Sequence, residues 1–196
     1  MENNILSKKV AWIPKRLPFR LSSMRYVMIT VGIFFLLPLS AQKINKDYLF
    51  YPQDKGILYF IYPQKGFISP DETDIKGLEY DITYLSTDDS LTLSFTYVNK
   101  EICKPEAISF ISPENQLLYK RETQMLFVQP LKQNWKHRGV VKIPYAKASQ
   151  IYEMVSPCRL QIHTNRMDIH YKISDSKWKK QHEMIKRILE IIANNN

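Results

Sequence analysis

The C-terminal third of the sequence contains three residues whose types and spacing are suited to binding a metal: His163, Asp168 and His170. Alternating apolar and polar residues around them predict an antiparallel hairpin in which Leu160 faces Tyr171. In that register His163 faces Asp168, and His170 lies diagonally across on the same polar face. Facing side chains are within about 5 Å and diagonal ones within about 7–8 Å, so two imidazoles and a carboxylate would converge on one ion. The alternative is a surface His–Asp pair without a metal, which is the commoner use of such residues.

The sequence offers little else for catalysis. It has no Gly-x-Ser-x-Gly motif and no glycine-rich phosphate loop, and neither cysteine has a histidine beside it in the predicted pairing. His137 has no assignable partner, and His182 is expected on the solvated side of a helix. We therefore predict no catalytic residue and no cofactor.

Cys103 and Cys158 are candidates for a disulfide, because an exported chain reaches an oxidising compartment. The bridge would close a loop of about 55 residues and contribute roughly 4 kcal/mol. The alternative is that both remain thiols, since Cys158 lies in an apolar register where cysteine behaves as a small hydrophobic residue.

Tyrosines are frequent between residues 48 and 67, where the candidate ligand-facing aromatic residues are Tyr48, Tyr51, Tyr59 and Tyr62. Exposed rings of this kind can stack on sugars or on a partner chain. The alternative is that the segment forms a first strand that completes the sheet and buries most of the rings.

The elements that would position these residues are mostly short antiparallel strands. One hairpin is predicted to pair Tyr84 with Leu93, Ile82 with Phe95 and Tyr80 with Tyr97; a second is predicted to pair Phe110 with Leu117 and Ile108 with Tyr119.

Two segments have helical periodicity instead. Apolar residues at three- and four-residue spacing predict a short helix from Tyr145 to Val155. A longer amphipathic helix is predicted over residues 175–193, with Trp178, Ile185, Ile188, Leu189 and Ile192 on its apolar side. The fold class is therefore mainly β: an antiparallel β-sandwich, immunoglobulin-like in architecture, with one short helix and a C-terminal amphipathic helix packed on the sheet.

Residues 1–41 have the pattern of an export signal. A basic region, unusually long unless translation starts at Met24, precedes an apolar run of eleven residues, Val27–Leu37. This run is too short to span a membrane, which needs about 20 residues, and Ser40 and Ala41 suit signal-peptidase cleavage. The prediction is cleavage at Ala41–Gln42, leaving one exported domain of residues 42–196; the alternative is an uncleaved N-terminal anchor.

Removal of the signal changes what the charge implies. The whole chain carries +9, with 28 basic and 19 acidic residues, but six of those basic residues lie in the signal. The remaining domain is near +4, which argues against a nucleic-acid partner. Residues 120–196 are basic and residues 42–119 acidic, so the two halves either complement each other or present a basic surface to an anionic partner.

The sequence thus predicts a non-catalytic binding module of the bacterial envelope, either periplasmic or at the outer envelope or secreted. Its partner would be another envelope protein, a glycan or an anionic membrane surface. One alternative is a small exported metal-dependent enzyme using His163, Asp168 and His170. Another is a structural subunit that adds a strand to a neighbour. The oligomeric state is left open.

Overall fold

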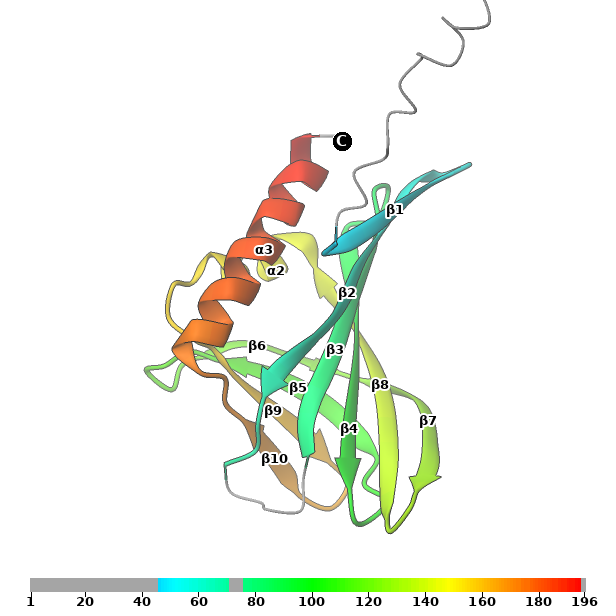
Figure 1. Ribbon diagram of the computed structural model, residues 1–196, viewed down its shortest axis with the longest axis vertical. Helices are drawn as coiled ribbons and strands as arrows, with labels where there is room; N and C mark the ends of the chain where they lie inside the picture. Colours follow the sequence, from blue (N-terminus) through cyan, green and yellow to red (C-terminus); the bar gives the residue numbers. More distant parts are fainter. Residues whose placement is uncertain (1–45, 71–75, 195–196) are drawn as a thin grey trace, which may run out of the picture. The chain divides into compact units, whose positions relative to one another are not determined.

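The computed structural model describes residues 46–70 and 76–194, which belong to one compact unit, Ile44–Asn196 (Figure 1). The predicted export signal, residues 1–41, and the cleavage point lie outside the described residues. Within them the predicted mainly-β sandwich is confirmed: two antiparallel sheets pack together, and two helices complete the fold.

The large sheet has the strand order β1-β2-β3-β4-β8-β7. Its strands are β1 (Tyr48–Gln53), β2 (Gly56–Phe67), β3 (Lys76–Leu85), β4 (Ser90–Asn99), β8 (Asn134–Pro144) and β7 (Gln124–Leu131). The small sheet has the order β10-β9-β5-β6. Its strands are β10 (Asp168–Tyr171), β9 (Arg159–Thr164), β5 (Pro105–Ile111) and β6 (Leu117–Glu122).

Only Thr123 separates β6 from β7, so the chain passes directly from the small sheet to the large one. The backbone N–H of Thr123 donates to the carbonyl of Glu106 in β5 at 2.8 Å. This link closes one side of the sandwich. On the opposite side of the large sheet, β1 is an edge strand within the part of the chain that the structure describes.

The register predicted for the C-terminal hairpin is confirmed, with Leu160 opposite Tyr171 and His163 opposite Asp168. The register predicted for β3 and β4 is wrong by two residues, since Ile82 pairs with Leu93 and not with Phe95. An even shift keeps every side chain on its predicted face. The reason is the turn: the N–H of Asp88 donates to the carbonyl of Leu85 at 2.9 Å, so β3 ends at Leu85 and β4 begins at Ser90.

The predicted β5–β6 register is also wrong, because Phe110 pairs with Tyr119 rather than Leu117. The turn itself is where the sequence places it: the N–H of Asn115 donates to the carbonyl of Ser112 at 3.1 Å, and Asn115 has a φ of 68°. Asparagine tolerates this left-handed conformation better than most residues. A register irregularity after Phe110 then leaves Leu117 exposed.

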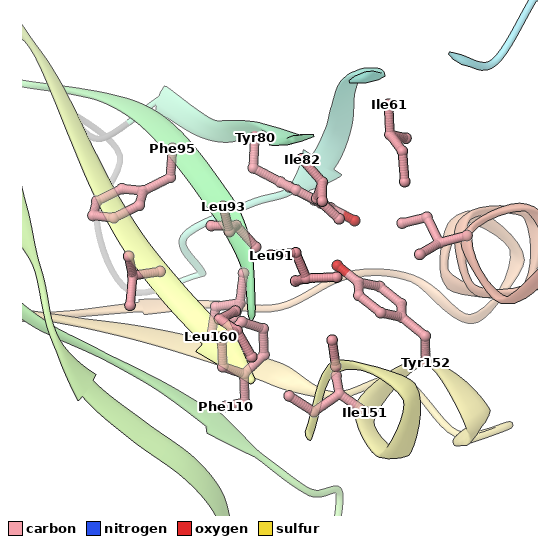
Figure 2. Packing of buried hydrophobic residues seen from close by; sticks show 14 of the residues in the cluster. Ile61, Tyr80, Ile82, Leu91, Leu93, Phe95, Phe110, Ile151, Tyr152 and Leu160 are labelled. Carbon is pink, nitrogen blue, oxygen red and sulfur yellow. The ribbon is translucent and has the colours of Figure 1, made fainter. Parts of the chain in front are cut away.

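The core lies between the sheets and under the helices. Figure 2 shows Leu91, Leu93 and Phe95 of β4 facing Phe110 and Leu160 of the small sheet. The hydroxyl groups of Tyr80 and Tyr152 point toward one another in the same view. The Tyr80 hydroxyl donates to Gln181 Oε1 at 3.1 Å, so this buried polar group is satisfied.

The short helix α2 (Tyr145–Glu153) forms as predicted but ends before Val155, which is 81% exposed. The following Met154 is extended, and Pro157 also disfavours continuation of the helix. The predicted place of Val155 on the buried side is therefore wrong.

Helix α3 (Asp175–Asn194) packs against β2 and α2, and all five predicted apolar residues are buried (Figure 1). The expectation for His182 is wrong: it is buried, because its ring stacks on Trp178 with centroids 5.9 Å apart. No helix in residues 46–70 and 76–194 has the length and hydropathy needed to cross a membrane.

Candidate functional site

The outer face of the small sheet brings together Ser109 of β5, His163 of β9 and Asp168 of β10. Ile108 and Phe110 point into the core, so the alternation of a strand turns Ser109 to the opposite face. On that face Ser109 lies opposite Gln161 of β9, and His163 lies opposite Asp168.

These three side chains form a continuous hydrogen-bonded chain, which we call the Ser109 relay. Ser109 Oγ lies 2.8 Å from His163 Nε2, and His163 Nδ1 lies 2.9 Å from Asp168 Oδ1. The amide of Gln161 donates to the other carboxylate oxygen at 2.7 Å. Two partners therefore hold the Asp168 carboxylate in place.

The carboxylate also fixes the histidine tautomer. An ionised Asp168 can only accept, so a neutral His163 carries its proton on Nδ1 and leaves Nε2 as an acceptor. The Ser109 hydroxyl then donates to Nε2. This is the connectivity by which a Ser–His–Asp arrangement activates a serine for nucleophilic attack. Ser109 is only 2% exposed, so neighbouring side chains on the outer face would have to move aside before a reactant could reach its hydroxyl.

A hollow of about 400 Å³ lies beside the relay, lined by Ile111, Asn115, Arg159, Leu160, His170 and Lys172. Arg159 also donates to Asn115 of the β5–β6 turn. The hollow contains no acidic residue in its lining, so Arg159 and Lys172 give it a positive charge.

The predicted metal ligands are only partly brought together. His163 and Asp168 are in contact, but His170 lies opposite Gln161 and is exposed. Both ring nitrogens of His163 already have protein partners. Across residues 46–70 and 76–194 there is no group of three His, Cys, Asp or Glu side chains placed to hold a metal ion.

Ser109 is the residue of this site that the sequence did not indicate. Its place between Ile108 and Phe110 predicts an outward side chain. However, its neighbour His163 is 54 residues away, and the β5–β9 pairing that joins them has no local sequence signal. A search for serines on the polar face of predicted strands would have included it among several others.

Cys103 and Cys158 are both buried thiols and are not joined in a disulfide. The N–H of Cys103 donates to His137 Nε2 at 3.1 Å, and the His137 ring stacks on Tyr97 with centroids 4.7 Å apart. His137 therefore has partners that its sequence position did not reveal. Burial raises the pKa of the Cys158 thiol to about 12.

The four candidate ligand-facing tyrosines separate into two groups. Tyr48 and Tyr59 are buried in the core, as the alternative of a completing strand predicts. Tyr51 is 52% exposed and Tyr62 is half-buried. Phe50, next to Tyr51, is 47% exposed.

Among residues 46–70 and 76–194, no strand pairs with the side of β1 that faces away from β2. The N–H of Tyr62 donates to the carbonyl of Asp47 at 3.1 Å, so these two residues form a hydrogen-bonded pair. Such pairs alternate along an antiparallel ladder, which leaves the N–H and C=O groups of Tyr48 and Phe50 pointing away from β2. Pro52 has the same orientation and lacks an N–H, as is usual for proline in an edge strand.

Comparison of the chain with protein-family models, with curated protein sequences and with solved structures finds no match in any of the three.

Proposed function

We propose that this protein is an exported binding module of the bacterial envelope that adds an extended segment of another envelope protein to its β1 edge. The observation that supports this proposal is the outward-facing backbone of Tyr48 and Phe50, next to the exposed rings of Phe50 and Tyr51. An edge strand of this kind is a template for strand addition.

The two exposed rings suit such a partner. Phe50 lies opposite Tyr59 and shares the inner face of the sheet, whereas Tyr51 lies opposite Leu58 on the outer face. An added strand would therefore meet an aromatic side chain on each face, which gives contact area beyond the backbone hydrogen bonds.

A hollow of about 560 Å³ beside the start of β1 favours an acidic partner segment. Its lining includes four basic side chains, Lys46, Lys179, Lys180 and Arg187, against Asp47 and Glu183. Opposite charge would speed association and fix the orientation of the bound segment. A glycan or an anionic membrane surface would use the same charges but not the β1 backbone.

The test is affinity capture from envelope extracts by the native protein and by Phe50→Lys, with identification of the retained material by mass spectrometry. Phe127→Lys is the matched control, since Phe127 is 39% exposed on β7, the other edge strand of the sheet. We expect a partner protein whose recovery falls about tenfold with Phe50→Lys and is unchanged with Phe127→Lys. Equal recovery by both variants, or retention of glycan or lipid alone, contradicts strand addition.

The localisation is tested on the same sample. We expect the native protein purified from the envelope to begin at Gln42. If residues 24–41 remain attached, the protein is anchored and not released into the envelope.

A further inference from the structure

We propose that the Ser109 relay is the catalytic site of an acyl-ester hydrolase, with Ser109 as nucleophile, His163 as general base and Asp168 as the residue that positions His163. The substrate class is a carboxylic ester that carries a negative charge. This activity is independent of binding at the β1 edge, because it uses the outer face of the other sheet.

The reaction needs only water as a second reactant. Ser109 Oγ attacks the ester carbonyl carbon while its proton passes to His163 Nε2, 2.8 Å away. The tetrahedral intermediate collapses, the ester C–O bond breaks and the departing alcohol takes the proton from the imidazolium. Water, deprotonated by His163, then attacks the acyl-serine; the carboxylic acid leaves and Ser109 recovers its proton.

Asp168 stabilises the imidazolium that forms in both steps. Its Oδ1 accepts from His163 Nδ1 at 2.9 Å, and the Gln161 amide restrains Oδ2. Because the carboxylate holds the productive tautomer before substrate arrives, little reorganisation is needed at the moment of proton transfer.

Lys120 is the cation nearest in register to the reacting carbonyl. It lies directly opposite Ser109 on β6, and facing residues of an antiparallel pair share a face. An ammonium group at that position would stabilise the negative charge that develops on the carbonyl oxygen.

The cationic hollow explains the preference for a charged ester. Ile111 and Arg159 are each two residues along their strands from Ser109 and Gln161, so the hollow begins about 7 Å from the nucleophile. An anionic group on the substrate would lie between Arg159 and Lys172 while the carbonyl carbon reaches Ser109. The volume of about 400 Å³ matches a small-molecule site.

The first test is covalent labelling of the native protein with diisopropyl fluorophosphate. We expect one adduct by intact mass, located on the peptide that contains Ser109 and absent in Ser109→Ala. The control Ser156→Ala changes an exposed serine after α2 and should label normally. An adduct elsewhere, or none, overturns the proposal without relying on the folding of any variant.

The second test compares hydrolysis of the anionic ester 4-acetoxy-3-nitrobenzoate with that of neutral 4-nitrophenyl acetate. We expect Ser109→Ala and His163→Gln to lower kcat/KM for both esters by about 100-fold or more. Asp168→Asn should lower kcat while KM is unchanged and should alter the pH–rate profile, which a merely structural role would not do. Rates in these variants equal to the native rate overturn the assignment.

The charge preference is tested by Lys172→Gln. We expect this variant to raise KM about tenfold for the anionic ester and to leave the neutral ester unaffected. Lys186→Gln, which removes an exposed charge from α3, is the matched control and should change neither. An equal rise in KM for both esters with Lys172→Gln would contradict the role of the hollow in substrate selection.

Discussion

At the residue scale, His137 is an example of a titratable group that the fold keeps neutral. Its ring is fully buried and stacked on Tyr97, and its Nε2 accepts the N–H of Cys103. A protonated imidazole has no acceptor nitrogen, so protonation would break this hydrogen bond. Burial also lowers the pKa of His137 below its ordinary value of 6.5.

This predicts a pH dependence of stability. Between 6.5 and the lower pKa of folded His137, the unfolded chain binds more protons than the folded one. The contribution of neutral His137 to the free energy of unfolding is therefore fully present above about pH 6.5. It decreases as the pH falls below that value, by up to about 1.4 kcal/mol per pH unit. Urea unfolding at several pH values measures the slope.

The control for this prediction is His137→Gln, which keeps an acceptor for the Cys103 N–H but does not titrate. Its free energy of unfolding should decrease less steeply below pH 6.5 than that of the native protein. The same slope in both proteins would assign the effect to other histidines.

The residues that sequence patterns predicted poorly are those with partners far away in the chain. The sequence does not indicate Ser109 and assigns no partner to His137. It predicts that His182 lies on the solvated side of its helix. Their contacts with His163, Cys103 and the Tyr152 carbonyl join different elements, 54, 34 and 30 residues apart in the chain. By contrast, the contact of His163 with Asp168 spans five residues within one hairpin and was predicted.

At the element scale, α3 is held to the sandwich by an aromatic stack and a polar contact. Trp178 stacks on both Tyr152 and His182, with ring centroids 5.9 Å apart in each pair, and its Nε1–H donates to the carbonyl of Met154 at 3.0 Å. Gln181 donates to the carbonyl of Lys65 in β2 at 2.6 Å. Together they connect the helix to α2 and to the large sheet.

We therefore predict that Trp178→Ala destabilises the protein by about 3–5 kcal/mol, because it removes the ring shared by both stacked pairs and leaves the Met154 carbonyl without its donor. The measurement is the urea midpoint, with the slope of the transition unchanged. Lys180→Ala, an exposed position on the same helix, should stay within about 0.5 kcal/mol of the native protein. If Trp178→Ala lowered the free energy of unfolding by no more than Lys180→Ala, α3 would contribute little to stability.

Strand identity was more predictable than strand register. Alternation placed Tyr80, Ile82, Leu93 and Phe95 on the core face, and all are buried. It could not fix the pairing, because a shift of two residues gives the same alternation. The order of strands in the sheets, such as β4 beside β8 and β5 beside β9, depends on contacts that no local pattern encodes.

At the scale of the whole molecule, the two cysteine thiols lie in different parts of one core. Cys103 follows β4 and contacts His137 of β8, whereas Cys158 precedes β9 and lies near Tyr80 and Tyr152. Both are buried, and only the thiolate form of cysteine reacts readily with alkylating reagents. Since burial raises the pKa of Cys158 to about 12, its thiol is protonated in the folded state.

We predict that iodoacetamide at mildly alkaline pH modifies neither cysteine of the native protein and both cysteines after denaturation. If the two sheets unfold as one cooperative unit, the two thiols should become reactive at the same urea concentration, because neither can reach the reagent without loss of the shared core. Peptide mass spectrometry after a short exposure measures each site separately. Earlier labelling of Cys103 would show that the end of the sandwich around His137 opens by itself. An intact mass lower by two hydrogens, with no labelling after denaturation, would instead reveal a disulfide between them.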